Sequence, residues 1–129
     1  MENLFIEGEL GNYYIPTVDF NVETGVCTIS GKSYLEDTTQ FYLPLLEWLD
    51  EYTQYKKPIQ FNVKLSYYNT SSSRSVLDIF DLLKLYEDKG GEIEVNWYCR
   101  DIDLDVIQEE VDDYMDESDL EINIVTFTD

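Results

Sequence analysis

The segment IQFNVKLSYYNTSSSRSVLDIFDLLKLYEDKGG, residues 59–91, reads as a strand, a polar turn and a helix in succession. In its first part apolar residues alternate with polar ones, which is the period of a half-buried strand. In its last part apolar residues recur three and four positions apart, as on one face of a helix, before Gly90-Gly91, which suits a left-handed helix end. The polar run from Asn69 to Ser73 joins the two. We therefore expect a strand that passes directly into a helix.

Before this segment the sequence predicts a hairpin and a helix. Residues 14–20 and 26–30 are strand candidates separated by turn residues, and residues 4–10 are a further edge-strand candidate. Pro16 limits its strand to an edge position or a strand start. A helix is expected to begin near Glu36 or Asp37. Because Pro44 lies inside its apolar pattern, the helix either begins near Leu43 or is kinked at the proline.

After the segment the pattern predicts a strand over residues 92–98, a helix from Asp103 or Leu104 to about Met115, and a last strand over residues 122–127. Strands separated by single helices favour parallel, right-handed crossovers. The expected fold class is therefore mixed α/β (α+β), as a single domain over residues 1–129. It would have three helices and a mixed sheet of four to five strands with an N-terminal hairpin. We expect the helices mainly to cover one face, and two-sided coverage stays open.

The composition restricts the classes of partner. The chain has 129 residues and a net charge of −20, from 28 acidic and 8 basic residues. Such a charge repels phosphate backbones and anionic lipids, which argues against nucleic acid and membrane surfaces as partners. The N-terminal residues lack the pattern of a signal peptide, and no apolar run approaches the ~20 residues of a membrane span. We therefore expect a cytoplasmic protein.

The absence of histidine removes several kinds of chemistry. Cys–His and Ser–His–Asp catalysis are both impossible without that residue. The two cysteines, Cys27 and Cys99, are too few for a structural zinc site and read as buried reduced thiols on strands. No glycine-rich phosphate loop is present, since Gly90-Gly91 follows a helix instead of preceding one. The sequence therefore predicts no cofactor, no metal and no enzymatic activity.

The strongest candidate site is the polar run at the start of the second helix. Asn, Ser and Thr at such a position can accept hydrogen bonds from the free helical N–H groups, and the helix dipole favours an added anion. A phosphate on Thr70 would therefore be tolerated, and Arg74, one turn away, could pair with it. The alternative is an ordinary helix cap with spare hydroxyl groups. The residues expected to contact a partner are Tyr68, Asn69, Ser71, Ser72, Ser73 and Arg74.

Two further features have weaker functional interpretations. Asp101, Asp103 and Asp105 alternate as in a calcium loop, but Val106 replaces the glycine and Asp112 the glutamate that such loops need. The alternative is a solvated acidic helix face. The 11 tyrosines are expected to lie mostly in the core. An exposed tyrosine beside Thr70 would be a good interface anchor, and a tyrosine-rich surface makes a homodimer possible.

Several motifs, in this order along the chain, resemble the SiaC family of bacterial regulatory phosphoproteins. They are Gly31-Lys32-Ser33-Tyr34-Leu35-Glu36-Asp37, Phe41-Tyr42-Leu43-Pro44 with Trp48-Leu49 and Tyr52, Tyr68-Asn69-Thr70-Ser71-Ser72-Ser73, and Asn96-Trp97-Tyr98. Two places depart from the family pattern. Leu35 stands where a proline is usual, and residues 99–103 replace a run that is usually tyrosine followed by acids.

The resemblance implies a fold similar to anti-sigma-factor antagonist (STAS-like) domains, with Thr70 as the phosphoacceptor. It also implies a GHKL-type Ser/Thr kinase, a PP2C-like phosphatase and, as output partner, a diguanylate cyclase that the unphosphorylated protein activates to promote biofilm formation. The resulting hypothesis is a partner switch, in which phosphate on Thr70 makes the patch costly to desolvate and releases the partner. The alternatives are a constitutive scaffold subunit with Thr70 only a cap, a small enzyme and a calcium-binding protein.

Overall fold

A computed structural model gives the architecture and describes residues 1–11 and 13–128. The strands within these residues are Leu4–Ile6 (β1), Glu9–Leu10 (β2), Tyr14–Ile15 (β3), Thr17–Phe20 (β4), Val26–Ser33 (β5), Ile59–Tyr68 (β6), Ile93–Arg100 (β7) and Asn123–Phe127 (β8). The helices are Thr38–Thr53 (α1), Thr70–Asp88 (α2) and Leu104–Ser118 (α3), with a short 3-10 turn at Asp101–Asp103 (η1).

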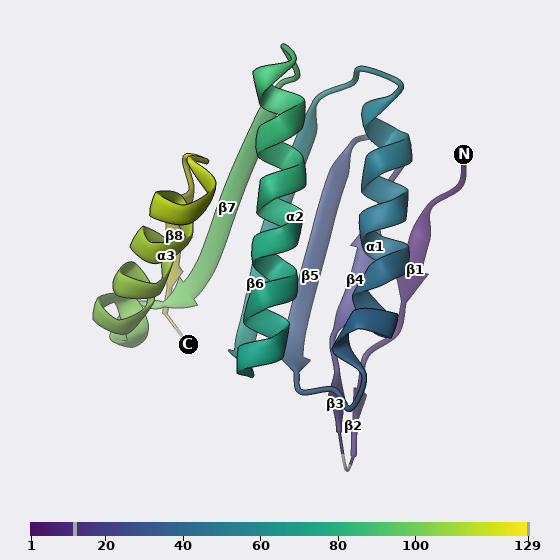
Figure 1. Cartoon of the computed structure of the whole chain (residues 1–129). Helices are drawn as coiled ribbons and strands as arrows, with labels where there is room; N and C mark the ends of the chain where they lie inside the picture. The colour runs from purple at the N-terminus through teal and green to yellow at the C-terminus, as the bar shows by residue number, and fades with distance from the viewer. Residues whose placement is uncertain (12, 129) are drawn as a thin grey trace.

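The main sheet has the strand order β1-β4-β5-β6-β7-β8 (Figure 1). Strands β1, β4 and β5 pair antiparallel, whereas β5, β6, β7 and β8 run parallel to one another. One helix connects each parallel pair, and all three helices lie on the same face of the sheet (Figure 1). The predicted mixed fold class, the three helices and the N-terminal hairpin are therefore confirmed, and coverage is one-sided.

The predicted strand count of four to five is wrong, because the main sheet has six strands. The extra strand is β1, which pairs along β4 and forms the sheet edge. Strands β2 and β3, which lie between β1 and β4 in the chain, are not strands of this sheet. Pro16 has no backbone N–H to donate, and it separates β4 from β3, which pairs with β2 in a separate ribbon.

Helix α1 begins beside Asp37 as predicted, whereas helix α3 ends later than predicted. Helix α1 begins at Thr38, where the Asp37 carboxylate accepts a hydrogen bond from the Gln40 N–H at 3.0 Å, and it continues through Pro44. The start near Leu43 is therefore wrong. Helix α3 extends past Met115 to Ser118, where Asp119 takes a left-handed conformation with φ 62° and ends it.

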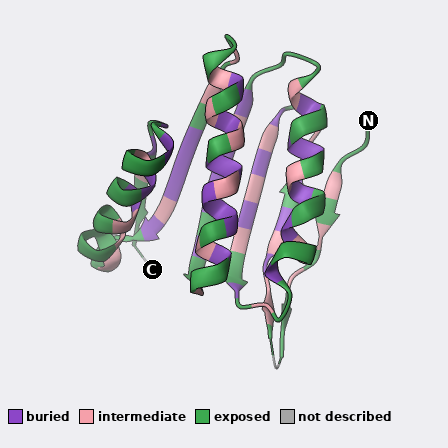
Figure 2. Cartoon of the chain, viewed as in Figure 1, coloured by how far each residue is buried: buried purple, intermediate pink, exposed green. Residues whose placement is uncertain are grey.

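The hydrophobic core lies between the helices and the sheet, as the buried inner sides in Figure 2 show. Its centre is a series of aromatic rings in contact, which runs from β4 across to α3. The series is Phe20, Phe61, Phe80, Trp97 and Tyr114, with ring centroids 5.2 to 6.4 Å apart. Burial of each such side chain stabilises the fold by about 1.5–3 kcal/mol.

The uncovered face of the sheet satisfies its polar groups internally. The Asn96 amide donates to Asn62 on β6 at 3.0 Å, and the Asn123 amide on β8 donates to Asn96 at 3.2 Å. Asn62 and Asn96 are buried, and the Asn96 amide at the centre of the row uses both its oxygen and its nitrogen in these bonds.

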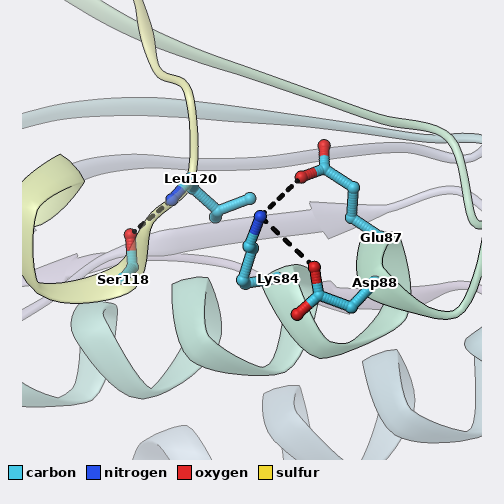
Figure 3. A network of polar contacts seen from close by, with 5 residues as sticks. All are labelled: Lys84, Glu87, Asp88, Ser118 and Leu120. Atoms are coloured by element: carbon cyan, nitrogen blue, oxygen red, sulfur yellow. Dashed lines mark hydrogen bonds and ion pairs between the residues drawn. The ribbon is translucent and has the colours of Figure 1, made fainter.

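Helix α3 is attached more lightly than its neighbours. Three of its 15 residues are buried, compared with eight of 19 in α2, and the first buried residue is Val111. Its C-terminal end is well fixed, because the Ser118 hydroxyl is buried, donates to the Tyr114 carbonyl at 2.7 Å and accepts from the Leu120 N–H at 3.2 Å (Figure 3). Its first half therefore depends on few contacts.

Candidate functional site at the start of helix α2

Thr70 is the first residue of α2, directly after the central strand β6, and it is exposed. Asn69 caps the helix, since its side-chain oxygen accepts the Ser72 N–H at 2.9 Å and the Ser71 hydroxyl at 3.2 Å. Within the described residues the Thr70 hydroxyl forms no hydrogen bond. The first turn contains no acidic residue. A helix N-terminus of this kind favours an added anion through its dipole and free amides.

A buried hydroxyl network fixes this turn to the sheet. The Ser33 hydroxyl on β5 donates to the Ser72 hydroxyl at 2.7 Å and lies 2.8 Å from the Tyr42 hydroxyl of α1. The Ser72 hydroxyl in turn donates to the Ser33 carbonyl at 3.1 Å. Burial raises the pKa of Tyr42 to about 12. Ser72 is fully buried, so its hydroxyl supports the site from beneath and is not part of the exposed patch.

The starts of α1 and α2 lie side by side. The Thr38 hydroxyl of α1 and the Ser71 hydroxyl of α2 are 2.9 Å apart, and the Asn69 N–H donates to the Ser33 carbonyl at 3.1 Å. Ser71 is exposed and Asn69 half-buried, so both belong to the surface around Thr70. The patch is therefore a set of neutral hydroxyl and amide groups above a buried hydrogen-bond network.

On its other side, Thr70 borders a cleft of about 480 Å³ between α2 and α3. Two hydrogen bonds connect residues on the two sides of this cleft. The Tyr68 hydroxyl donates to the Glu110 carboxylate, and the Ser73 hydroxyl lies 2.7 Å from the Tyr114 hydroxyl. Burial, with the Glu110 carboxylate beside it, raises the pKa of Tyr68 well above its usual value. Tyr68 and Ser73 are half-buried, and their hydroxyl groups link the segment around Thr70 to helix α3 by hydrogen bonds.

Arg74 is the one cation among the described residues that line the cleft. Its side chain is 72% exposed and forms an ion pair with Asp78 at 3.4 Å. An exposed pair of this kind contributes little to stability, so the guanidinium can exchange Asp78 for a stronger anion at low cost. It lies one helical turn from Thr70 and can therefore reach a phosphate there.

Sequence reasoning did not place Tyr34 and Tyr67 in the site. Both are exposed, at 41% and 48%, and their ring centroids are 6.3 Å apart. Tyr13, also exposed, stacks on Tyr34 at 6.2 Å. The row ends beside the site, because Tyr67 precedes Thr70 by three residues and Tyr34 follows the network residue Ser33. Strand alternation could have found Tyr67, since adjacent Tyr68 points the other way.

The other candidates do not form sites. No cluster of metal-binding side chains occurs among residues 1–11 and 13–128. Asp101 accepts a hydrogen bond from the Thr128 hydroxyl, and Asp103 pairs with Arg100 at 3.0 Å. Cys27 and Cys99 are free and buried on strands, as predicted, and burial raises the pKa of Cys27 to about 12. None of the helices in the described part of the chain has the length and hydrophobicity of a membrane span.

Comparison with known proteins gives a consistent result. Residues 10–127 match the family described as SiaC family regulatory phosphoprotein. An uncharacterized protein of Pseudomonas aeruginosa (strain UCBPP-PA14) is 25% identical over 89 residues, which cover 68% of this chain and 71% of that protein.

Solved structures share the fold. Apo-SiaC from Pseudomonas aeruginosa superposes with a TM-score of 0.85 at 22% identity, covering 96% of this chain and 98% of the other. A second structure contains SiaC as the activator in a complex with the diguanylate cyclase SiaD, also from Pseudomonas aeruginosa. Its SiaC chain superposes with a TM-score of 0.84 at 20% identity. That match covers 95% of this chain and all of the other.

Proposed function

Since this chain belongs to the SiaC family of regulatory phosphoproteins, we propose that it is a partner-switching protein controlled by phosphorylation of Thr70. The unphosphorylated form binds and activates a diguanylate cyclase, and the phosphorylated form releases it. The protein itself catalyses no reaction and acts in the cytoplasm. A GHKL-type kinase adds the phosphate and a PP2C-like phosphatase removes it.

One observation carries the proposal: an exposed threonine hydroxyl, hydrogen-bonded to none of the described residues, lies at the N-terminus of a 19-residue helix whose first turn has no acid. In a chain with 28 acidic residues, this is a place where an anion meets helical N–H groups and a nearby arginine. The fold can therefore carry the phosphate, while a bound partner would have to desolvate it.

The partner surface has two parts. The first is the neutral patch of Asn69, Thr70 and Ser71, which gains about −1.5 to −2 units of charge on phosphorylation. The second is the tyrosine row of Tyr13, Tyr34 and Tyr67, which supplies amphipathic rings of the kind that anchor protein interfaces. The tyrosine row contributes to the affinity for the partner. The patch controls whether the partner binds, because only the patch changes its charge on phosphorylation.

The cyclase encoded in the same genome tests the proposal directly. Wild type, Thr70→Ala and Thr70→Asp are compared for binding by calorimetry and for stimulation of cyclic-di-GMP synthesis. We expect Thr70→Ala to bind within a few-fold of wild type and Thr70→Asp to lose binding and stimulation together. If both variants bound as well as wild type, the switch would be wrong.

The second candidate is a constitutive scaffold subunit in which Thr70 is only part of a helix cap. The Asn69 cap, complete without the Thr70 side chain, is compatible with it. Tandem mass spectrometry of the protein recovered from its own cells separates the two. Phosphate on Thr70 supports the switch, whereas its absence under all growth conditions supports the scaffold.

A further inference from the structure

We propose that a phosphate on Thr70 loosens the first half of helix α3 from α2 and β6, so that α3 carries the phosphorylation state to a second surface. This inference rests on the proposed function, because it takes Thr70 as the phosphoacceptor. It adds a moving element to a switch that otherwise acts only through charge at the patch.

The wall of the cleft opposite Thr70 is acidic. Three acidic α3 residues line it together with Thr70, namely Glu110, Asp113 and Glu117. Helix α3 carries seven acidic side chains and no basic one. A dianionic phosphate at the mouth of this cleft faces like charge, with Arg74 as the one cation among the described lining residues.

The ties that hold α3 here flank the phosphorylation position. Tyr68, two residues before Thr70, donates to Glu110, and Ser73, three residues after it, bonds to Tyr114. A charge added between them therefore acts on both contacts. The Tyr68 bond is the more sensitive, because its acceptor is itself one of the carboxylates that the phosphate repels.

The packing identifies which half of α3 moves. Residues 104–110 contain no buried side chain, whereas Val111, Tyr114 and Ser118 are buried. The C-terminal end is fixed by Ser118 and by the buried Leu120 that follows it (Figure 3). The helix therefore has a fixed end and a lightly held end, and Glu110, which Tyr68 holds, is the last residue of the lightly held half.

The layer beneath α3 already contains an unsatisfied group. The Trp97 indole stacks on the Tyr114 ring at a centroid distance of 5.3 Å and is fully buried. Its N–H has no hydrogen-bond partner among the described residues. Because this buried donor has no partner, the packing of α3 on Trp97 is less favourable than its apolar contacts alone indicate.

Hydrogen exchange on the full chain tests the inference. Phosphothreonine is introduced at Thr70 by genetic encoding, and amide exchange is compared with the unmodified protein. We expect amides of residues 107–114 to exchange at least ~10-fold faster in the phosphorylated protein, because opening of a local unit sets their rate. Amides within α1 should be unchanged.

Two matched variants isolate the cause. Phosphothreonine at Thr39, an exposed position in the first turn of α1, adds the same charge to a neighbouring helix start and should leave α3 exchange unchanged. The variant Glu110→Gln, Asp113→Asn, Glu117→Gln keeps an acceptor for Tyr68 and should lose most of the effect of phosphate at Thr70.

The inference is overturned if exchange in α3 is the same with and without phosphate at Thr70. It is also overturned if phosphate at Thr39 accelerates α3 equally, or if the neutralised variant responds like wild type. Binding to the cyclase is measured on the same samples. Loss of binding with unchanged α3 exchange would leave the proposed switch intact and remove only the movement of α3.

Discussion

The starts of helices α1 and α2 are neighbours with a similar capping pattern but different electrostatics. Each begins with a capping side chain followed by hydroxyl residues, and the two are joined through Thr38 and Ser71 at 2.9 Å. The α1 cap is the charged Asp37, whereas the α2 cap is the neutral Asn69. Thr38 is buried, whereas Thr70 is exposed.

The difference teaches why one of two similar turns suits a switch. At α1 an anion already occupies the helix N-terminus, and a second one would be repelled by it. At α2 the position is neutral and accessible, with Arg74 within one turn. A helix start that is capped without charge keeps its dipole available for a phosphate that arrives later.

The largest expected effect comes from placing the same charge at each start. Thr70→Asp should weaken cyclase binding by about 100-fold, or ~3 kcal/mol, because the partner must desolvate an unpaired charge. Thr39→Asp, at the exposed position of α1, should change the affinity less than about twofold. Calorimetric titration of both variants checks this, and equal losses would remove the distinction between the two turns.

The shared support beneath both starts is tested by Ser33→Ala. The change leaves the Tyr42 hydroxyl of α1 and the Ser72 hydroxyl of α2 without their common partner. We expect the free energy of unfolding to fall by about 2 kcal/mol. Urea denaturation measures it, with the half-buried Ser30→Ala as control. A loss no larger than the control's would mean that the network does not hold the turns.

The tyrosine row is expected to contribute the next largest effect on binding. Tyr67→Ser combined with Tyr34→Ser should weaken cyclase binding about tenfold, since exposed aromatic rings are the side chains that commonly anchor protein interfaces. Tyr55→Ser removes a ring of similar exposure at the opposite end of α1 and serves as control. Equal affinities for the double variant and the control would exclude the row from the partner surface.

Alkaline pH tests the burial of Tyr42 beneath the start of α1. Burial raises its pKa from 10.0 in the reference state to about 12 in the folded protein. The stabilisation is therefore fully present below about pH 10 and is lost as the pH rises toward about pH 12, because the unfolded chain ionises first. Tyr42→Phe should reduce this pH-dependent loss by about 1–2 kcal/mol. Urea denaturation at about pH 8 and about pH 11 measures it, and an unchanged loss would contradict the assignment.

The smallest effect is expected from exchanging the caps. Asn69→Asp gives α2 the charged cap of α1 and should stabilise the protein by about 0.3–1 kcal/mol, while slowing phosphorylation of Thr70. Asp37→Asn is the reciprocal change and should destabilise by a similar amount. Thermal unfolding and phosphate incorporation by the cognate kinase measure the two effects. Faster phosphorylation of the Asn69→Asp variant would contradict the electrostatic explanation.

Local patterns predicted the elements that define the site. Strand alternation in residues 59–67 and helical spacing after Arg74 are strong signals, and β6 and α2 form where they predict. The position of Thr70 follows from them, because the polar run has to join the two. What the sequence did not give is the burial of Ser72 under Ser33, which depends on the pairing of β5 with β6.

The remaining differences have tertiary causes. The edge-strand candidate over residues 4–10 is confirmed in part, because Leu4–Ile6 pairs with β4 as β1, whereas Glu9–Leu10 pairs with β3 outside the main sheet. The acidic helix α3 reads as a solvated face, and its inner carboxylates line the cleft only through the crossover from β7. Strand pairing between segments far apart in the sequence decides both the sheet edge and the position of α3. A short window of sequence contains no pattern that predicts such pairing.

The affinity of the cognate diguanylate cyclase for the chain carrying phosphothreonine at position 70 tests the central claim most directly. The account predicts that stoichiometric phosphate lowers the affinity by at least ~100-fold and that treatment with a PP2C-like phosphatase restores it. Equal affinity of the phosphorylated and unmodified proteins would contradict it.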